Sequence, residues 1–268
     1  ITAMNGVPTM FIAMFNHPDY RKTDFSHMRT GIMAGAGCPP ELMRRAAQPD
    51  EMNMRGIVSV YGQTESSPGS TMSAWTDPLD LRTNTVGYDF PHVECKIIDP
   101  ETGEELDYYE IGEICISGPT LMKGYYNNPE ETANVMRTHA DGKVWVHSGD
   151  VGYFDEDGFL FIKGRVKRMI TRFDGHKVFP VNIESMVAKH ESVHNVCVIG
   201  VDDRHHGQGQ YPLVVIEVDE GAERAKVCKD VFDECMDKLE ERGKPVAVIP
   251  IDKIPLTGAG KNDYRTLE

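Results

Sequence analysis

The sequence predicts an α/β fold that continues into an antiparallel sheet or barrel and ends in a small α+β domain. Three observations predict it: turns, helix-like and strand-like stretches alternate over residues 28–60, short alternating apolar stretches follow between about 86 and 163, and a second set of helices and strands comes after Gly164. The length of 268 residues exceeds that of one typical domain, so one large or two smaller domains are expected.

The first region combines a turn, a helix and a strand. The Gly/Pro-rich stretch 35–40 predicts a turn, the residues from Glu41 onward predict a helix, and 57–60 predicts a strand. Between about 86 and 163, apolar and polar residues alternate, as in 93–98, and Asp-Pro, Thr-Gly and Asp-Gly turns separate these stretches. This spacing is typical of antiparallel strands.

The region after Gly164 predicts a helix that begins at Pro180 and packs through Ile183 and Val187. The stretch 224–242 predicts the most regular helix of the chain, because apolar residues recur there at every fourth position. Its apolar stripe indicates core packing rather than a cofactor site. Strands are predicted at three further apolar stretches: 195–201, 211–218 and 246–251.

Composition and charge exclude several classes of function. The formal net charge of −14 argues against a nucleic-acid partner, because phosphate backbones are bound by clustered Lys and Arg. We expect no transmembrane segment, since no apolar run approaches the ~20 residues that a spanning helix needs. The six scattered cysteines, with no spacing typical of a zinc site, indicate reduced thiols of a cytoplasmic protein. The first residues show neither an initiator Met nor a signal-peptide pattern, so the sequence is expected to begin at a cut.

Two small motifs carry candidate chemistry at the ends of predicted strands. Positions 61–65 hold Tyr-Gly-Gln-Thr-Glu, in which the carboxylate of Glu65 suits Mg²⁺ and the ring face of Tyr61 suits a purine. Positions 35–37 hold Gly-Ala-Gly, small residues that let backbone approach a ligand closely. Taken alone, the first motif can equally be a strand-end turn with a solvated Glu, and the second a plain turn.

Three more stretches follow in the middle of the chain. Residues 112–119 and 124–132 predict a strand and a loop with a chiefly architectural role. Residues 147–150 hold His-Ser-Gly-Asp and precede an acidic turn at 155–158. An EF-hand would need Glu at position 166, where Val stands, so a hairpin turn is favoured over a calcium site.

The last part of the chain carries the basic residues. Residues 163–177 hold six Lys or Arg against one acid, which suits either phosphates or a solvated basic face. Residues 255–261 hold Pro-Leu-Thr-Gly-Ala-Gly-Lys. A Walker A loop is excluded there, because Pro255 takes the leading glycine position and Asn262 follows the lysine.

Taken together, the order and spacing of these motifs resemble the AMP-forming acyl-CoA synthetases of the adenylate-forming (AMP-binding) superfamily, most closely its medium- and long-chain fatty acyl-CoA ligases. The resemblance implies that residues 1–166 are the C-terminal part of the large AMP-binding domain, α/β with an antiparallel sheet or barrel. Residues 167–268 would be the small mobile α+β domain. The phosphate-binding loop of that family, rich in Thr, Ser and Gly, occurs nowhere in the 268 residues, so about the second half of such an enzyme is expected.

The resemblance also assigns roles to individual residues. Thr64 would contact the α-phosphate, Glu65 would hold Mg²⁺, and Lys261 would be the catalytic lysine that reaches the α-phosphate and the attacking carboxylate. Lys167 would be the hinge between the domains. The remaining assigned positions would bind the nucleotide or coenzyme A: Gly35, Ala36, Gly37, Tyr61, Gly62, Asp150, Ile162, Arg165 and Gly175.

Two of these assignments carry specific chemistry. The two oxygens of Asp150 would accept hydrogen bonds from the ribose hydroxyls. Gly175 would flank the channel for the pantetheine arm of coenzyme A, in a segment one residue longer than the usual loop of the family.

The implied reaction has two steps. A fatty acid of medium or long chain attacks the α-phosphate of MgATP to give acyl-adenylate and pyrophosphate, and coenzyme A then displaces AMP. The chain alone is expected to be inactive. Two alternatives stay open: a catalytically silent nucleotide-binding or interaction homologue, and a peptide-synthetase adenylation domain. The joint presence of Glu65, Asp150, Arg165 and Lys261 favours an enzyme, because a silent module has no need of them.

Overall fold

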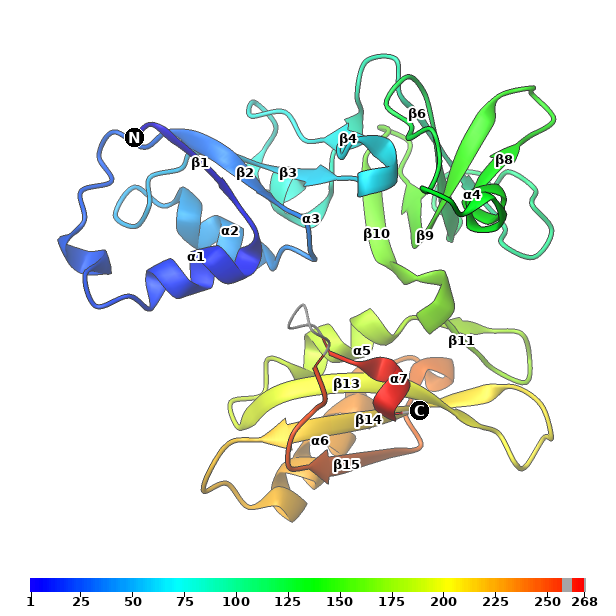
Figure 1. The fold of residues 1–268 in the computed structure, drawn as a ribbon. Helices are drawn as coiled ribbons and strands as arrows, with labels where there is room; N and C mark the ends of the chain where they lie inside the picture. The colour runs from blue at the N-terminus through cyan, green and yellow to red at the C-terminus, as the bar shows by residue number, and fades with distance from the viewer. Residues whose placement is uncertain (257–261, 268) are drawn as a thin grey trace. The chain divides into compact units, whose positions relative to one another are not determined.

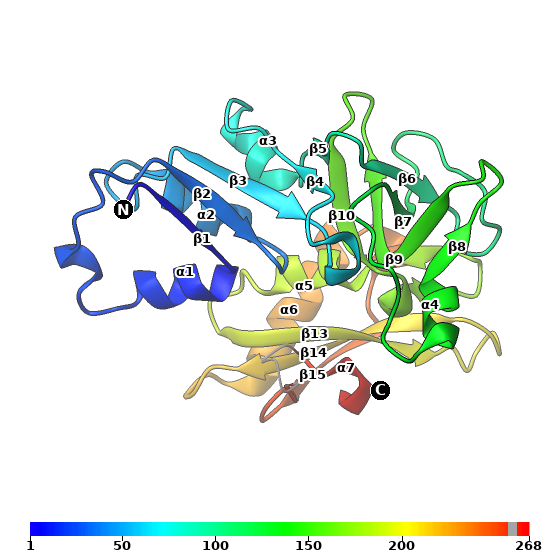
Figure 2. The same ribbon diagram turned by 45° about the horizontal axis from the view of Figure 1, so that its top comes forward.

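The computed structural model describes residues 1–256 and 262–267, and the chain divides into two compact units, Ile1–Ile162 (unit 1) and Lys163–Glu268 (unit 2). Figures 1 and 2 show the ribbon in two views. The helices of unit 1 are α1 (Pro8–Phe15), α2 (Pro40–Ala47), α3 (Leu79–Asn84) and α4 (Pro129–Val135). Its strands are β1 (Ala3–Gly6), β2 (Thr30–Ala34), β3 (Gly56–Tyr61), β4 (Thr71–Met72), β5 (Tyr88–Asp89), β6 (Glu94–Ile98), β7 (Gly112–Ser117), β8 (Met136–Thr138) and β9 (Val144–Phe154).

Strand β10 (Leu160–Arg165) crosses the boundary into unit 2. The other strands of unit 2 are β11 (Ile170–Thr171), β12 (Lys177–Val178), β13 (Val193–Asp202), β14 (Gln210–Val218) and β15 (Ala247–Ile251). Its helices are α5 (Pro180–Val187), α6 (Arg224–Lys238) and α7 (Tyr264–Leu267). Short 3-10 turns are η1 (Tyr20–Lys22), η2 (Thr64–Ser66), η3 (Val166–Arg168) and η4 (Glu241–Gly243).

Unit 1 begins with a five-stranded sheet in the order β1-β2-β3-β4-β5. The first three strands are parallel, and α1 and α2 connect them as βαβ crossovers (Figure 1). A proline stands at the start of both helices, where its fixed φ and missing N–H cost no hydrogen bond. Phe11 of α1 and Met43 of α2 are fully buried against Met33 and Ile57 of the sheet. This core fixes the strands whose ends carry the candidate site.

The second sheet of unit 1 is antiparallel and follows the order β10-β9-β7-β6, with β8 paired to β9. Ile97, Ile114 and Leu160 bury one face of this sheet, and Cys115 and Trp145 are buried on strands β7 and β9 in a separate cluster. Within the described residues the sheet is open. The antiparallel sheet predicted from the spacing is confirmed, and the barrel alternative does not apply.

Unit 2 is a three-stranded sheet, β13-β14-β15, with helices packed on it. Alternate residues of β13 face opposite ways, as a strand requires. Val196 and Val198 pack with α5 and α6, whereas Cys197 and Ile199 pack with α7. The predicted α+β domain is therefore confirmed, and helix α6 buries the stripe that the four-residue period predicts. It ends at Lys238, earlier than predicted, because the chain is extended from Leu239.

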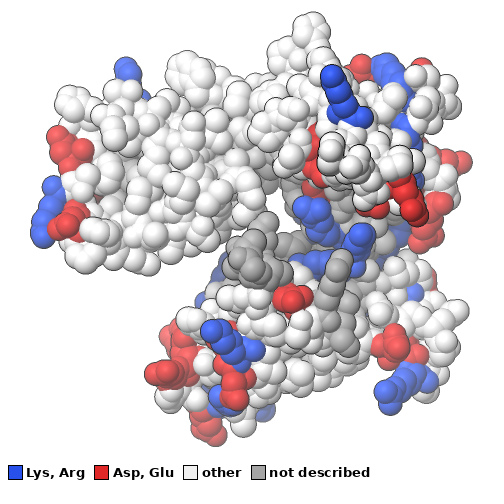
Figure 3. All heavy atoms as spheres, in the orientation of Figure 1, with Lys and Arg blue, Asp and Glu red and all other residues white. Residues whose placement is uncertain are grey.

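On the face shown in Figure 3, charged side chains lie in small groups, and the surface of unit 1 over β1 and α1 is largely uncharged. Met10 and Ile12 of α1 are each nearly half exposed. Among the described residues, no helix is long and apolar enough to cross a bilayer.

Candidate functional site

Two of the predicted nucleotide-binding segments leave the same edge of the parallel sheet. Ala34 is paired in register with Val60, so the turn at Gly35 and the loop at Tyr61 begin side by side at the carboxyl ends of β2 and β3. Gly35 has a φ of +81°, in the region that favours glycine. Residues 35–37 are exposed, so their backbone is available to a ligand.

The loop after β3 is held in one conformation by close packing. A Cβ on Gly62 would lie 1.8 Å from the carbonyl oxygen of Pro68, so only glycine fits without a backbone shift. A capping box opens η2: the Gln63 side chain accepts a hydrogen bond from the backbone of Ser66, whose hydroxyl accepts one from the Gln63 N–H at 3.2 Å. Thr64 is thereby fixed at the start of η2 with its side chain exposed.

Glu65, the predicted Mg²⁺ ligand, is tied to a segment 60 residues away. The Tyr125 hydroxyl donates a hydrogen bond to Glu65 Oε1 at 2.6 Å, and the Met122 N–H donates to the Glu65 main-chain oxygen at 2.8 Å. The bond to Glu65, together with burial, raises the pKa of Tyr125 to about 12. The carboxylate is therefore held by a partner, which argues against a merely solvated Glu.

Asp150, the predicted ribose ligand, is only 8% exposed and lies in a β-bulge. Strand β9 carries extra residues opposite the stretch from Glu113 to Cys115, and Gly149 within them has a φ of +69°. Bulges redirect side chains. The Tyr61 hydroxyl donates a hydrogen bond to Asp150 Oδ2 at 2.9 Å. Burial and the Asp150 charge raise the pKa of Tyr61 well above its ordinary value, so the phenol stays a donor.

Glu113 holds this bulge in place. Its Oε1 accepts a hydrogen bond from the Gly149 N–H at 3.0 Å, and its Oε2 lies 2.9 Å from His147 Nδ1. Burial pushes the pKa of Glu113 upward, but the bond with His147 and the Gly149 N–H outweigh it and hold this pKa below its ordinary value. An ionised Glu113 therefore positions the strand segment that carries Asp150.

Three predicted positions follow one another along β10 and η3. Ile162 is 36% exposed and is the last residue of unit 1. Arg165 ends β10 and Lys167 lies in η3, both in unit 2 and both exposed. An exposed residue in a single 3-10 turn can change its backbone angles without disrupting a packed core.

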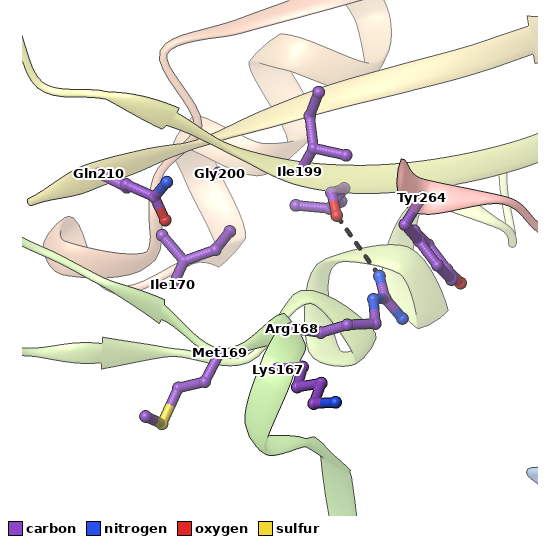
Figure 4. Close-up of a pocket in the computed structure, with 9 residues that line it drawn as sticks. Lys167, Arg168, Met169, Ile170, Ile199, Gly200, Gln210 and Tyr264 are labelled. Carbon is purple, nitrogen blue, oxygen red and sulfur yellow. Dashed lines mark hydrogen bonds between the residues drawn. The ribbon is translucent and has the colours of Figure 1, made fainter. Parts of the chain in front are cut away.

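Arg168, in the basic stretch, is engaged within unit 2. Its Nη2 lies 2.6 Å from Glu184 Oε1. Figure 4 shows its two other contacts: Nη2 lies 3.4 Å from the carbonyl oxygen of Val198, and the guanidinium lies 3.5 Å from the ring centroid of Tyr264. This arginine joins α5 and α7 to β13. At Arg168 the basic stretch therefore has a structural role and is not a solvated basic face.

Gly175 lies in the hairpin loop between β11 and β12. Its N–H donates to the carbonyl oxygen of Arg172 at 2.9 Å, and its φ is +78°. A Cβ here would meet no atom within 4 Å. The turn conformation, rather than a close approach within the chain, accounts for glycine at this exposed position. Lys261, the predicted catalytic lysine, lies outside the described residues.

Sequence reasoning missed two groups of side chains at this site. Tyr125 was placed in an architectural loop, although a tyrosine in a polar loop after a strand can supply a hydroxyl. Glu113 and His147 were not assigned, because their contact depends on strand pairing across 34 residues. Alternation in β7 could have shown which side chains share a face, but not the register.

The fold is similar to that of solved proteins that bind ATP, as comparison with known structures shows. The ATP-bound MatB from Rhodopseudomonas palustris superposes with a TM-score of 0.81 at 30% identity, over 99% of this chain and 50% of that one. A family model of the AMP-binding enzymes matches residues 1–126, and a model of the AMP-binding enzyme C-terminal domain matches residues 182–261. The chain belongs to the AMP-binding enzyme family.

Named relatives are ligases and synthetases. The putative acyl-CoA synthetase YngI of Bacillus subtilis is 38% identical over 97% of this chain and 45% of its own length. The mitochondrial medium-chain acyl-CoA ligase ACSF2 of Mus musculus is 35% identical over 97% of this chain and 40% of its own length. The chain thus spans less than half the length of these curated relatives.

Proposed function

We propose that this chain forms part of an ATP-dependent acyl-CoA ligase. The complete protein adenylates a carboxylic acid, releases pyrophosphate and passes the acyl group to coenzyme A, with AMP as the other product. The observation that carries the proposal is the hydrogen bond between Tyr61 and Asp150, which joins an aromatic ring suited to adenine and a carboxylate suited to ribose hydroxyls. The names of its acyl-CoA synthetase and ligase relatives support it.

The loop after β3 supplies two residues that we assign to the α-phosphate and its metal ion. We assign contact with that phosphate to the exposed hydroxyl of Thr64, and Mg²⁺ to Glu65, whose side chain is partly exposed. One carboxylate plus substrate phosphates is a usual Mg²⁺ environment, so Glu65 fits the ion. Mg²⁺ would supply charge neutralisation of the phosphates. Lys261 is assigned to the charge that builds on the α-phosphate during adenylation.

The remaining assigned residues bind the nucleotide, the acyl group or coenzyme A, or act as the hinge between the domains. Backbone at Gly35, Ala36, Gly37 and Gly62 lies where two loops leave the sheet edge, which suits close approach to adenine and the acyl group. Asp150, Ile162 and Arg165 are assigned to the nucleotide, and Gly175 to the pantetheine channel. We place the domain boundary between residues 166 and 167, with Lys167 as hinge. The division of the chain near residue 162 supports a junction in this stretch.

The acid is proposed to be a medium- or long-chain fatty acid, because a relative with 35% identity is named a medium-chain acyl-CoA ligase. The cytoplasm is the proposed compartment. All six cysteines are free thiols in the structure, as a reducing compartment requires, although the same relative is named mitochondrial.

Fatty-acid-dependent exchange of pyrophosphate into ATP tests this function in the complete protein that carries this chain. Exchange should occur with medium or long chains and fall at least about 10-fold in Asp150→Asn, because a hydrogen bond to a charged group contributes roughly 1.5–3 kcal/mol. Asp157→Asn, in an exposed turn, is the matched control. Exchange with no carboxylate at all would favour the silent homologue, and exchange only with amino acids would favour a peptide-synthetase domain.

Two further measurements test the role of Lys261 and the expected inactivity of the 268 residues alone. Lys261→Ala should sharply reduce adenylate formation and spare thioester formation from supplied acyl-adenylate; equal loss of both would contradict the assigned role. The 268 residues alone should show no turnover, because the chain spans only 45% of the YngI sequence. Robust turnover by the isolated chain would refute that part of the proposal.

A further inference from the structure

A second group of chemically active side chains lies on the antiparallel sheet of unit 1. Cys115 is on β7, His147 is on β9, and His139 follows β8. The Cys115 sulfur and one ring nitrogen of each histidine lie within 4.8 Å of one another. Strand β9 runs between β7 and β8, and Cys115 is paired in register with His147, which places these side chains next to each other.

We propose that Cys115, His139 and His147 bind one transition-metal ion of the zinc class, with a fourth position left for water or an exogenous ligand. A thiolate and two imidazoles form a donor set that zinc favours, whereas Mg²⁺ and Ca²⁺ prefer oxygen. The proposal is independent of the proposed ligase function and of Glu65.

The two histidines are oriented as metal ligands need to be. His147 Nδ1 lies 2.9 Å from Glu113 Oε2, so its Nε2 is directed to the cluster. A carboxylate on the far nitrogen of a ligating histidine is the common outer-shell arrangement of metal sites. His139 stacks on Trp145 with ring centroids 5.8 Å apart, and the Trp145 N–H donates to Asp141 at 3.0 Å. Both rings are therefore fixed before an ion binds.

The spacing of the nitrogens is close to that of a metal site. His139 Nε2 and His147 Nε2 are 3.0 Å apart, so one of them carries the shared proton. Two nitrogens at about 2.0–2.1 Å from a tetrahedral zinc lie roughly 3.3 Å apart. A shift of a few tenths of an ångström and a change of tautomer at His139 are enough for both lone pairs to point at one ion.

The three donor groups determine how many protons the chain releases when the ion binds. Cys115 is fully buried, and its thiol proton leaves to solvent when the sulfur binds the ion. The shared imidazole proton moves to His139 Nδ1 and stays on the protein. One proton per ion is therefore released.

Charges of both signs surround the cluster, and the cations Lys96 and Arg137 both act on Cys115 and His139. Lys96 lies close, with its ammonium 4.2 Å from the centroid of Trp145. It is 3.6 Å from Glu105 and 4.0 Å from Asp141, so carboxylates offset its charge. Glu113 supplies a further negative charge beside His147. His139 is partly exposed and marks the side from which an ion can enter.

Titration of the metal-free chain with Co²⁺ as the probe tests the proposal, followed by competition with Zn²⁺. One ion per chain should bind, with a thiolate-to-cobalt charge-transfer band, visible bands of tetrahedral cobalt and release of one proton. Cys115→Ser should abolish the charge-transfer band. His139→Gln should weaken affinity by at least about 100-fold, more than the 10- to 100-fold loss expected for the outer-shell variant Glu113→Gln.

Matched controls are Cys235→Ser, another fully buried cysteine, and His194→Gln, an exposed histidine of unit 2. Both variants should bind Co²⁺ with the affinity and the charge-transfer band of the unchanged chain. His139→Gln changes a partly exposed hairpin residue, so it keeps the test valid if Cys115→Ser does not fold. Absence of stoichiometric Co²⁺ binding, a charge-transfer band that survives Cys115→Ser in the folded chain, or equal weakening by the controls would overturn the proposal.

Discussion

Replacing Gly62 by alanine gives a sharp test of how tightly the loop after β3 is packed. The new Cβ would lie 1.8 Å from the carbonyl oxygen of Pro68, 2.8 Å from its carbonyl carbon and 3.0 Å from the Cα of Gly69. Two backbone segments would have to separate by more than 1 Å, since ordinary van der Waals contact begins at 3.4 Å. Overpacking of this kind typically costs about 1–3 kcal/mol.

Gly37→Ala is the matched control, because a Cβ there meets no atom within 4 Å and its φ is not positive. Both substitutions reduce the entropy of the unfolded chain equally, which stabilises by about 0.4–1 kcal/mol where the native backbone accepts alanine. The control should therefore be neutral or slightly stabilised. Because the entropy gain is common to both variants, they should differ by the overpacking cost alone, about 1–3 kcal/mol.

Urea unfolding followed by tryptophan fluorescence is the assay. Both tryptophans, Trp75 and Trp145, lie in unit 1, so their signal reports the unit that contains Gly62. The midpoint should fall in Gly62→Ala with little change in slope. Equal midpoints for Gly62→Ala and Gly37→Ala would refute the close packing of this loop on Pro68.

The remaining predictions concern two hydrogen-bonded carboxylates of unit 1. Tyr61→Phe removes the donor to buried Asp150 and should lower the unfolding free energy by about 1.5–3 kcal/mol in the same assay; a change below ~0.5 kcal/mol would contradict the bond. Burial pushes the pKa of Glu51 upward, but hydrogen bonds from Tyr20 and Arg45 outweigh it and hold this pKa below its ordinary value. Ionised Glu51 therefore stabilises the fold above pH ~4.3. The unfolding free energy lost in Glu51→Gln, measured by urea unfolding at several pH values, should shrink as the pH falls below this value. A loss that does not change with pH would contradict the lowered pKa of Glu51.

Local sequence patterns predicted the helices and strands, but not whether the antiparallel strands form an open sheet or a closed barrel. The four-residue period of 224–242 and the apolar stretches at 195–201 and 211–218 correspond to α6, β13 and β14, because each pattern reports one buried face. Whether the antiparallel strands form a sheet or a barrel depends on pairing between distant strands, which alternation does not encode. The same limit hid the end of α6, where the backbone leaves the helix before its apolar stripe ends.

The candidate site shows this limit at the level of single residues. Tyr61 and Glu65 were predicted from a local motif whose side chains suit a purine and Mg²⁺, and Asp150 was predicted from the family resemblance of its motif. Their partners were not all found. The hydrogen bond of Glu65 joins residues 60 apart and that of Asp150 joins residues 89 apart, so both depend on the packing of two sheets. Tyr125 lies in a loop whose sequence alone gave no reason to link it with Glu65.

The two proposed sites of unit 1 meet at the bulge in β9. A regular strand would pair every residue from Ser148 to Asp150 with β7, but the register shift between the pairs Cys115–His147 and Glu113–Val151 leaves these three residues without regular partners. Glu113 compensates by accepting from the Gly149 N–H with one oxygen and bonding His147 with the other. The same carboxylate therefore fixes both the backbone that presents Asp150 to Tyr61 and the imidazole that faces Cys115.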